Sequence, residues 1–241
     1  MHVNNSKTFN HIPSKYTFDN LKCVTTEGSR HYVTPDGDKY FSVTTVTGHK
    51  KNAFFAEWRR KNPKESVRVT RRGNHLHSLI EDYINNEELN PKGDETLLFK
   101  QALPMLNNID NVYAQEVPLY SKLLKLAGRV DCVAEYKGKL SIIDFKGSTR
   151  EKRVSDIGNY FQQATAYAIM WKELTGQTID QIVILITSED GSTQEIVDNP
   201  INHVASLRQT IEDFQNLKVG DIVTVEVEEA GEYDLWGRQI T

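Results

Sequence analysis

The chain has 241 residues and a formal net charge of −4, which argues against a protein that coats nucleic acid through an all-round basic surface. Its 38% hydrophobic and 26% charged residues are ordinary for a globular protein, and no apolar run approaches the roughly 18 residues that a membrane span requires. The first residues lack the apolar core of a signal peptide, and two cysteines indicate neither a disulfide framework nor a zinc cluster. We therefore expect one domain that stays in the cytoplasm.

The N-terminal part of the chain is expected to be rich in β-structure. Strand-type sequence covers 22–26, 30–34 and 39–43, and the segment Pro35-Asp36-Gly37-Asp38 predicts a turn before the third strand. Helical sequence follows over 51–62, 66–85 and 95–108. The first of these helices is predicted to end at Pro63, and the third to be kinked near Pro104.

The second half of the chain alternates strands and helices. A strand is predicted over 112–120 and a hairpin over 126–146, and a helix over 157–174 is expected to end at Gly176. The apolar segment 179–187 predicts a buried central strand. A helix over 204–217 and a last edge strand over 219–227 complete the pattern.

This order of elements predicts an α/β (α+β) fold in which helices flank a mixed central sheet, with a cleft at one sheet edge. Within the single expected domain, residues 1–45 form a β-rich extension and residues 46–218 form the core with a helical insertion. Residues 219–241 form a C-terminal strand and an acidic tail.

The predicted hairpin brings two aspartates and a lysine together. A two-residue loop at Lys137-Gly138 would place Asp131 directly opposite Asp144, whereas a loop at Gly138-Lys139 would place Asp131 opposite Lys146. Both registers leave the three charged side chains on one face. A three-residue loop would separate them.

Two carboxylates side by side repel each other unless a positive charge lies between them, and a divalent cation would supply that charge. Carboxylate oxygens suit magnesium or manganese, and a lysine beside them could stabilise the charge that develops in phosphodiester hydrolysis. A solvated hairpin face with an Asp–Lys pair would give the same pattern. Asp144, however, lies between Leu-Ser-Ile-Ile and Phe in a strand that is expected to be mostly buried, which favours a metal site.

Other polar residues outside the hairpin are candidates for the same site. His77 and Glu81 are four residues apart on a predicted helix and share one face, although surface pairs with this spacing are common. Gln163 and Tyr167 have the same spacing at the margin of an apolar helix face, where half-buried packing residues are also common. Glu116, in the strand sequence AQEVPLY, could join the site or face solvent.

A strongly basic run lies between Arg59 and Arg72. Many such runs are solvated helix faces, but a basic strip beside a carboxylate cluster also suits a phosphate backbone. The residues that we expect to contact DNA in this run are Arg59, Arg60, Arg68, Arg71 and Arg72.

Five elements in sequence order resemble the motifs of a known family. They are Gly73-x-x-x-His77-x-x-x-Glu81, Glu116-x-Pro118, Gly128-Arg129-Val130-Asp131, Asp144-Phe145-Lys146 and Gln163-x-x-x-Tyr167. This pattern resembles the RecB-type nucleases of the PD-(D/E)XK superfamily, and within it the mitochondrial genome maintenance exonucleases and their bacteriophage relatives. The resemblance covers roughly residues 40 to 215 and implies a restriction-endonuclease-like core.

The resemblance also implies a role for each matching residue. His77, Asp131 and Asp144 would ligate the metal together with the main-chain carbonyl of Phe145, and Lys146 would be the catalytic lysine. Glu116 would support the metals, and Gln163 and Tyr167 would order the lysine side of the site. Gly147 departs from the pattern, because relatives often carry Thr there. This departure puts a secondary phosphate contact in doubt, while Ser148 stays a candidate DNA contact.

These implications favour a Mg²⁺- or Mn²⁺-dependent deoxyribonuclease that acts as an exonuclease on single-stranded DNA ends. An endonuclease of the same superfamily and a non-catalytic nucleic-acid-binding module are the alternatives. The bacteriophage likeness implies the host cytoplasm as location, and replication or recombination proteins as partners.

Overall fold

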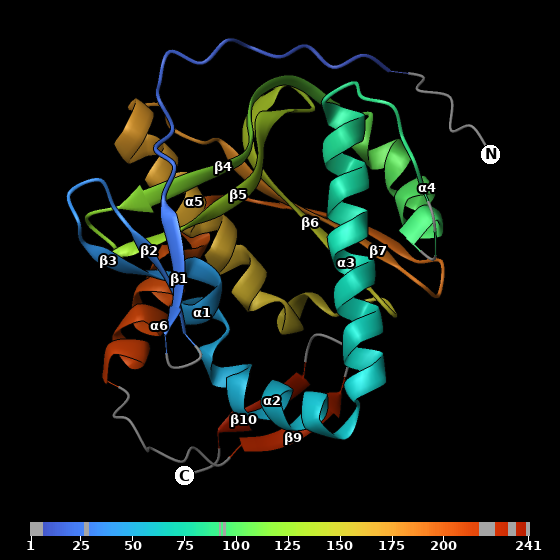
Figure 1. The fold of residues 1–241 in the computed structure, drawn as a ribbon, viewed down its shortest axis with the longest axis vertical. Helices are drawn as coiled ribbons and strands as arrows, with labels where there is room; N and C mark the ends of the chain where they lie inside the picture. The colour runs from blue at the N-terminus through green and yellow to red at the C-terminus, as the bar shows by residue number, and fades with distance from the viewer. Residues whose placement is uncertain are drawn as a thin grey trace.

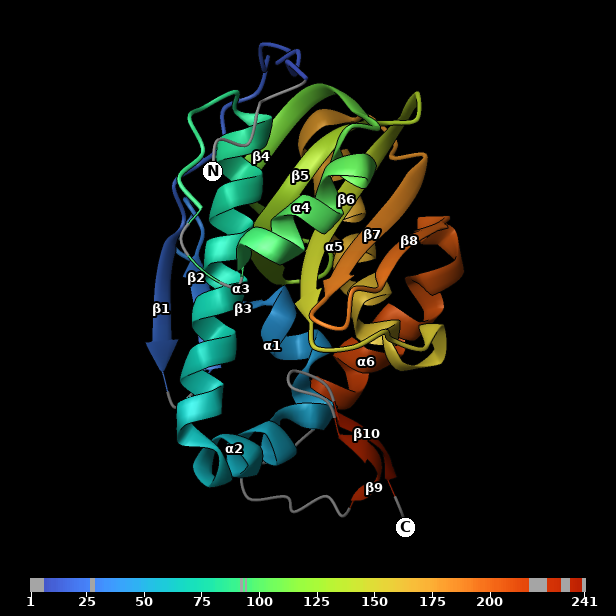
Figure 2. The same ribbon diagram turned by 90° about the vertical axis from the view of Figure 1, so that its right-hand side faces the viewer.

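In the computed structural model, an eight-stranded mixed sheet forms the centre of the molecule, and helices cover both of its faces (Figures 1 and 2). The structure describes residues 7–26, 29–91, 93, 95–216, 225–230 and 235–239. The predicted α/β class with a mixed, helix-flanked sheet is confirmed. Within the described residues, no helix is long and apolar enough to cross a membrane.

The N-terminal extension continues the central sheet. Strands β1 (Lys22–Thr26), β2 (Ser29–Val33) and β3 (Lys39–Ser42) form an antiparallel meander, and β3 then pairs in parallel with the start of β5. Gly37 has a φ of +87° in the turn before β3, a conformation that glycine adopts without steric cost. The predicted third strand ends one residue early, because helix α1 (Val43–Thr47) begins at Val43.

Strands β4 (Ile109–Ser121), β5 (Leu126–Tyr136) and β6 (Lys139–Ser148) form the middle of the sheet. The β5–β6 turn is the two-residue Lys137-Gly138 loop, in which both residues have positive φ, and Tyr136 pairs with Lys139. This turn has the twist that suits a tight hairpin. Of the two registers considered above, the structure therefore has the one that places Asp131 across from Asp144.

One edge of β5 carries two different partners. Its C-terminal half pairs with β6 as far as Cys132↔Ile143, and its first residues pair with β3 at Leu126 and Ala127. Between these contacts, Gly128 to Val130 pair only with β4 among the described strands. The sheet therefore forks at this point, and the fork leaves room for side chains from other elements.

Two helical layers cover the sheet. Helix α3 (Pro63–Ile84) and helix α4 (Glu95–Leu106) pack on one face, where Leu76, Tyr83 and Phe99 are fully buried. Helices α1, α5 (Gly158–Thr175) and α6 (Val204–Asn216) cover the opposite face, where Trp171 is buried. Helix α2 (Asn52–Lys61) joins the two layers at one end of the molecule (Figures 1 and 2). Three short 3-10 turns cover His49–Lys51, Val154–Asp156 and Pro200–His203.

The predicted helix boundaries agree with the structure to within a few residues. Helix α3 begins at Pro63, because proline suits the first helical position, and α5 ends at Gly176, which has a φ of +74°. Pro104 lies inside α4. Strand β7 (Gln181–Ser188) is buried along its whole length between β6 and β8, as predicted for the apolar segment.

The C-terminal strand prediction needs correction. The edge of the central sheet is β8 (Thr193–Asp198), which was not predicted, and it pairs antiparallel with β7. The predicted edge strand over 219–227 lies partly outside the described residues. Its described end belongs to β9 (Val225–Ala230), which pairs with β10 (Leu235–Gln239) in a separate two-stranded sheet.

Candidate functional site

The fork in the sheet orients Asp131. The backbone pairing of β6 with β5 stops at the Cys132↔Ile143 pair, and the main-chain N–H of Phe145 instead donates to the side-chain Oδ2 of Asp131 at 2.9 Å. In an extended strand the N–H and C=O of one residue point toward the same side. The carbonyl of Phe145 is therefore directed toward the same space as the Asp131 carboxylate.

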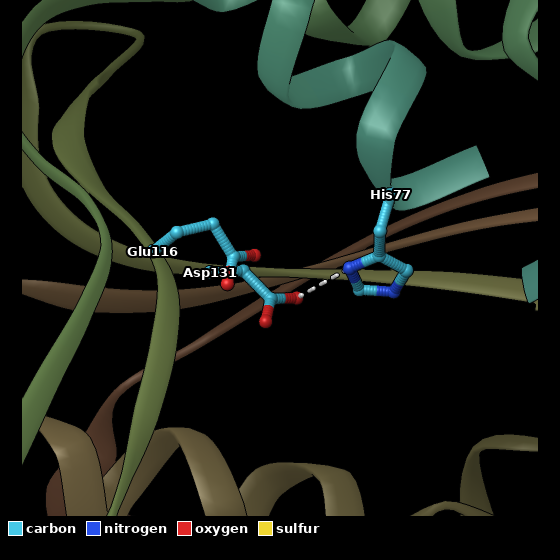
Figure 3. A group of neighbouring side chains, drawn as sticks. All are labelled: His77, Glu116 and Asp131. Atoms are coloured by element: carbon cyan, nitrogen blue, oxygen red, sulfur yellow. Dashed lines mark ion pairs between the residues drawn. The ribbon is translucent and has the colours of Figure 1, made fainter. Parts of the chain in front are cut away.

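Three side chains from three elements converge at the fork. His77 comes from α3, Glu116 from β4 and Asp131 from β5, and one ligating atom from each lies within 4.8 Å of the others (Figure 3). Nδ1 of His77 lies 3.7 Å from Oδ2 of Asp131. Each of these side chains is half-buried, so the cluster is shielded from bulk water but open to a ligand.

Glu116 is held in an unusual backbone conformation. Its φ is +50°, which is uncommon for a residue other than glycine, and the guanidinium of Arg129 donates to its carbonyl oxygen. Glu116 lies across from Asp131, because the flanking pairs are Gln115↔Cys132 and Val117↔Val130. Burial, followed by the charges of Asp131 and Glu81, raises the pKa of Glu116 to about 8.

Asp144 and Lys146 form an ion pair beside this cluster. Nζ of Lys146 lies 2.8 Å from Oδ1 of Asp144 and 2.7 Å from Oδ2, and the amide of Gln163 donates to Oδ1 at 2.9 Å. Asp144 is 2% exposed, and burial raises its pKa to about 6 even though Lys146 counteracts this effect. The Nζ atom of Lys146 also lies 5.2 Å from the centre of the Tyr160 ring.

The donor set fits a hard divalent cation. One imidazole nitrogen and two carboxylates can each supply a ligand atom, and the Phe145 carbonyl faces the same side. Glu116, whose pKa is raised, would bind a cation in exchange for its proton. The cluster in the structure and the predicted metal ligands share His77 and Asp131. The third clustered residue is Glu116, whereas the third predicted side chain was Asp144, whose carboxylate is hydrogen-bonded to Lys146 and Gln163.

Tyr167 lies against the bare backbone of Gly128. A Cβ atom added at Gly128 would lie 2.6 Å from the Tyr167 hydroxyl and 3.0 Å from its ring, so only glycine allows this approach. Tyr167 is 2% exposed, and its pKa is raised well above the usual value by burial and by the neighbouring carboxylates. The hydroxyl therefore stays protonated and can donate a hydrogen bond.

A cleft of about 720 Å³ joins these groups. Its walls contain predicted site residues, namely His77, Glu81, Glu116, Asp131, Lys146, Gln163 and Tyr167. They also contain residues that sequence reasoning did not identify as site residues, namely Arg30, Tyr32, Ser42, Thr44, Asn74, Ser78, Gly128 and Arg129. Gly128 and Arg129 lie within a quoted motif, and Ser42 and Thr44 lie in a segment, Phe41-Ser42-Val43-Thr44, that also resembles the family, but no local pattern near Arg30 indicates that it reaches the cleft.

The basic run divides into exposed and buried members. Arg59 and Arg60 are exposed on α2, and Arg71 is exposed on α3. Arg72 is 3% exposed and forms an ion pair with Glu189, which also binds Arg68 at 2.7 Å. The expected contact between Arg72 and DNA does not fit this burial and this ion pair with a carboxylate.

Ser148 is buried as well. Its hydroxyl donates to the carbonyl of Arg150 at 2.7 Å and accepts from the N–H of Arg150 at 3.3 Å. These hydrogen bonds hold the turn of the chain that follows β6. The predicted direct contact between this side chain and DNA does not fit its burial.

The sequence pattern of the PD-(D/E)XK nuclease superfamily matches residues 106–232, which is more than half of the chain. The chain belongs to this superfamily.

Individual relatives match shorter segments. Mitochondrial genome maintenance exonuclease 1 of Homo sapiens is 33% identical over 84 residues, a match that covers 33% of this chain and 24% of the relative. Ribosomal protein uS12 methylthiotransferase RimO of Ruegeria pomeroyi is 46% identical over 63 residues, which cover 26% of this chain and 13% of that protein. The chain thus spans a quarter or less of the length of these two relatives.

Among solved structures, a candidate exonuclease from Eubacterium rectale is 14% identical. The match covers 61% of this chain and 64% of the chain in that structure, with a TM-score of 0.38.

Proposed function

We propose that this protein is a metal-dependent deoxyribonuclease that removes nucleotides from single-stranded DNA ends. The observation that carries the proposal is the convergence of His77, Glu116 and Asp131 beside the Asp144–Lys146 pair, within one cleft of a chain of this superfamily. The human relative is named an exonuclease, which supports action from an end.

The roles of the chain's residues follow from their positions. His77, Glu116 and Asp131 hold Mg²⁺ or Mn²⁺, with the Phe145 carbonyl available on the same side and Asp144 next to it. A bound ion lowers the pKa of water and neutralises phosphate charge. Lys146 places a positive charge beside the phosphate, and Gln163 and Asp144 fix the position of that ammonium group.

Imidazole is a softer ligand than a carboxylate, and manganese tolerates it better than magnesium. We therefore expect activity with both ions and a higher rate with Mn²⁺. A cytoplasmic location, bacteriophage origin and a role in replication or recombination are part of the same proposal. The bacteriophage origin and the role in replication or recombination rest on the sequence resemblance alone.

The test compares a linear single strand, labelled at either end, with the same strand circularised, in Mn²⁺, Mg²⁺ or EDTA. Cleavage of the linear strand alone, lost in EDTA, would support an exonuclease and give its polarity. Cleavage of the circle would make the protein an endonuclease. No cleavage of single- or double-stranded DNA with either metal would favour a non-catalytic nucleic-acid-binding module.

A further inference from the structure

Three carboxyl groups line the cleft, and in their ionised form they oppose the binding of a polyanionic substrate. These groups belong to Glu81, Glu116 and Asp131, and the charge of Lys146 is paired with that of Asp144. Because DNA carries one negative charge for each phosphate, these carboxylates repel the strand wherever no cation intervenes. A metal ion at the three-residue cluster would compensate only the phosphate at that point.

Two arginines lie on the sheet wall of the same cleft. Arg30 is exposed on β2, and Arg129 is exposed on β5, two residues before Asp131. Within the described part of the chain, neither arginine forms an ion pair with a carboxylate. Both lie close to the Tyr32 hydroxyl, whose pKa is raised by burial and lowered by the charges of these two guanidinium groups.

A neutral partner positions the side chain of Arg129. Arg129 donates to the carbonyl oxygen of Glu116, which uses one of its five N–H donors and leaves the rest for another acceptor. Arg30 lies on the same strand as Tyr32, and its charge lowers the pKa of the Tyr32 hydroxyl, against the larger raising effect of burial. A guanidinium held by a neutral oxygen keeps its full charge and its fork of donors, which match the geometry of a phosphate.

We propose that Arg30 and Arg129 form a phosphate clamp that holds the DNA strand one or more nucleotides away from the scissile phosphate. The clamp rests on the proposed nuclease function and extends it to this chain's own mode of substrate binding. It places the strand between β2 and β5 on one side and α3 on the other, where Asn74 and Ser78 form the opposite wall.

The clamp differs from the basic run of the helices. Arg68 and Arg72 are bound to Glu189, and Arg59 and Arg60 lie on α2, which contributes no residue to the wall of the cleft. The sheet-wall arginines share the cleft with the metal cluster. We expect them to set the affinity for the strand during the reaction.

The experiment measures kcat and KM with Mn²⁺, and binding of a fluorescent single-stranded oligonucleotide in EDTA, at several salt concentrations. Each phosphate contact contributes about 0.7 to the slope of log affinity against log salt for a single strand. Arg30→Gln is expected to lower that slope by about this amount and to weaken binding about tenfold at low salt. Because the loss affects ground state and transition state alike, KM should rise while kcat changes less than about twofold.

Arg129→Gln is expected to give the same loss of slope. Its bond to the Glu116 carbonyl could also disturb the metal cluster, so Arg30→Gln is the decisive variant. Arg30→Lys should retain the slope, because a lysine still contacts phosphate as a point charge. Arg208→Gln is the matched control, since Arg208 is 80% exposed on α6 and the substitution changes the net charge equally.

The outcomes separate the clamp from the nuclease proposal. Wild-type cleavage together with an unchanged salt slope in both Arg30→Gln and Arg129→Gln would overturn the clamp and leave the nuclease. If Arg59→Gln and Arg60→Gln lowered the salt slope instead, the DNA strand would be assigned to α2. Absence of cleavage by the wild-type protein, with salt-dependent binding that still requires Arg30, would overturn the nuclease and keep the phosphate site.

Discussion

The ammonium group of Lys146 is held between a buried carboxylate and an aromatic ring, so its position is fixed before substrate arrives. We expect Lys146→Ala to lower kcat by about 10²- to 10³-fold, since one preorganised charge near the reacting phosphate has an effect of this size. Single-turnover cleavage of an end-labelled strand in Mn²⁺ measures the loss. Unchanged kcat would rule out a direct role for the lysine.

Lys139→Ala is the matched control for this variant. Lys139 lies on the same strand, but it is exposed beside the hairpin turn and outside the cleft. Removal of this side chain should leave kcat within about twofold of the wild-type value, because a distant exposed charge adds little to transition-state stabilisation. A similar loss in both variants would indicate a general effect of charge on DNA binding.

Because Gly128 has no side chain, the ring and hydroxyl of Tyr167 can lie directly against its backbone. We expect Gly128→Ala to destabilise the fold by about 1–3 kcal/mol, because the new Cβ would lie 2.6 Å from the hydroxyl of Tyr167, which is itself buried. Urea denaturation measures this change. Tyr167→Phe removes the hydroxyl, so in that background the same substitution should cost less.

The Gly128 prediction is open to a direct contradiction. Equal costs of Gly128→Ala in the wild-type and Tyr167→Phe backgrounds would mean that the strand moves away from α5 or that the tyrosine does not lie there. A crystal structure of the single variant would separate these two cases by the position of the Tyr167 ring.

The residues of the metal cluster were only partly predictable from the sequence. The spacing of His77 and Glu81 on one helix is a local feature, and it predicts that both side chains lie on the same face of α3. The meeting of Glu116 and Asp131 depends on the register of β4 against β5 and on the positive φ at Glu116. Neither property follows from a local sequence pattern, because strand register is set by tertiary packing.

At the level of elements, Glu189 connects α3 to the end of β7. It pairs with the buried Arg72 and with Arg68, and these hydrogen bonds lower its pKa even though partial burial has the opposite effect. We expect Glu189→Gln to destabilise the protein by about 1–3 kcal/mol, because it leaves a buried guanidinium beside a neutral amide. The change is measured as a lower urea midpoint with an unchanged m-value.

Glu212→Gln provides the comparison for Glu189→Gln. Glu212 also pairs with an arginine, but Arg208 is 80% exposed on α6, and surface pairs contribute about 0–1 kcal/mol. Equal effects of the two substitutions would show that burial of Arg72 does not make its ion pair more important than a surface pair.

The elements themselves were predictable where one face is apolar. The period of α3 and α5 and the apolar run of β7 are strong local signals, and the turn at Lys137-Gly138 has a characteristic composition. Strand β8 escaped prediction because it lies at the sheet edge and alternates exposed with half-buried residues, without a strong apolar side. Tertiary pairing with β7 determines that segment more than its own propensity does.

For the whole molecule, the crowded carboxylates couple stability to pH. The pKa of Glu116 is raised to about 8, whereas a glutamate in an unfolded chain ionises near 4.3. Between these values the folded protein binds one proton more than the unfolded chain, so the free energy of unfolding falls as the pH rises. Asp144, with a pKa of about 6 raised by burial, contributes in the same direction.

We therefore expect the metal-free protein to lose stability from about pH 5 to about pH 8. Glu116 is partly accessible to solvent, so its share is discounted to on the order of 1–2 kcal/mol, or about 2–8 °C in Tm. Thermal unfolding in EDTA across this range measures the effect. Glu116→Gln cannot ionise and should flatten part of the slope, whereas an identical slope in the variant would assign the pH dependence to other groups.

The same linkage predicts how a metal ion changes the stability of the protein. An ion that binds at Glu116 and Asp131 displaces the proton of Glu116, so its affinity rises with pH, and ligand binding stabilises only the folded state. Added Mn²⁺ should therefore raise Tm more at about pH 8 than at about pH 5.5, and Asp131→Asn should abolish most of the difference. An increase in Tm that is independent of pH and survives in Asp131→Asn would mean that the ion binds elsewhere on the molecule.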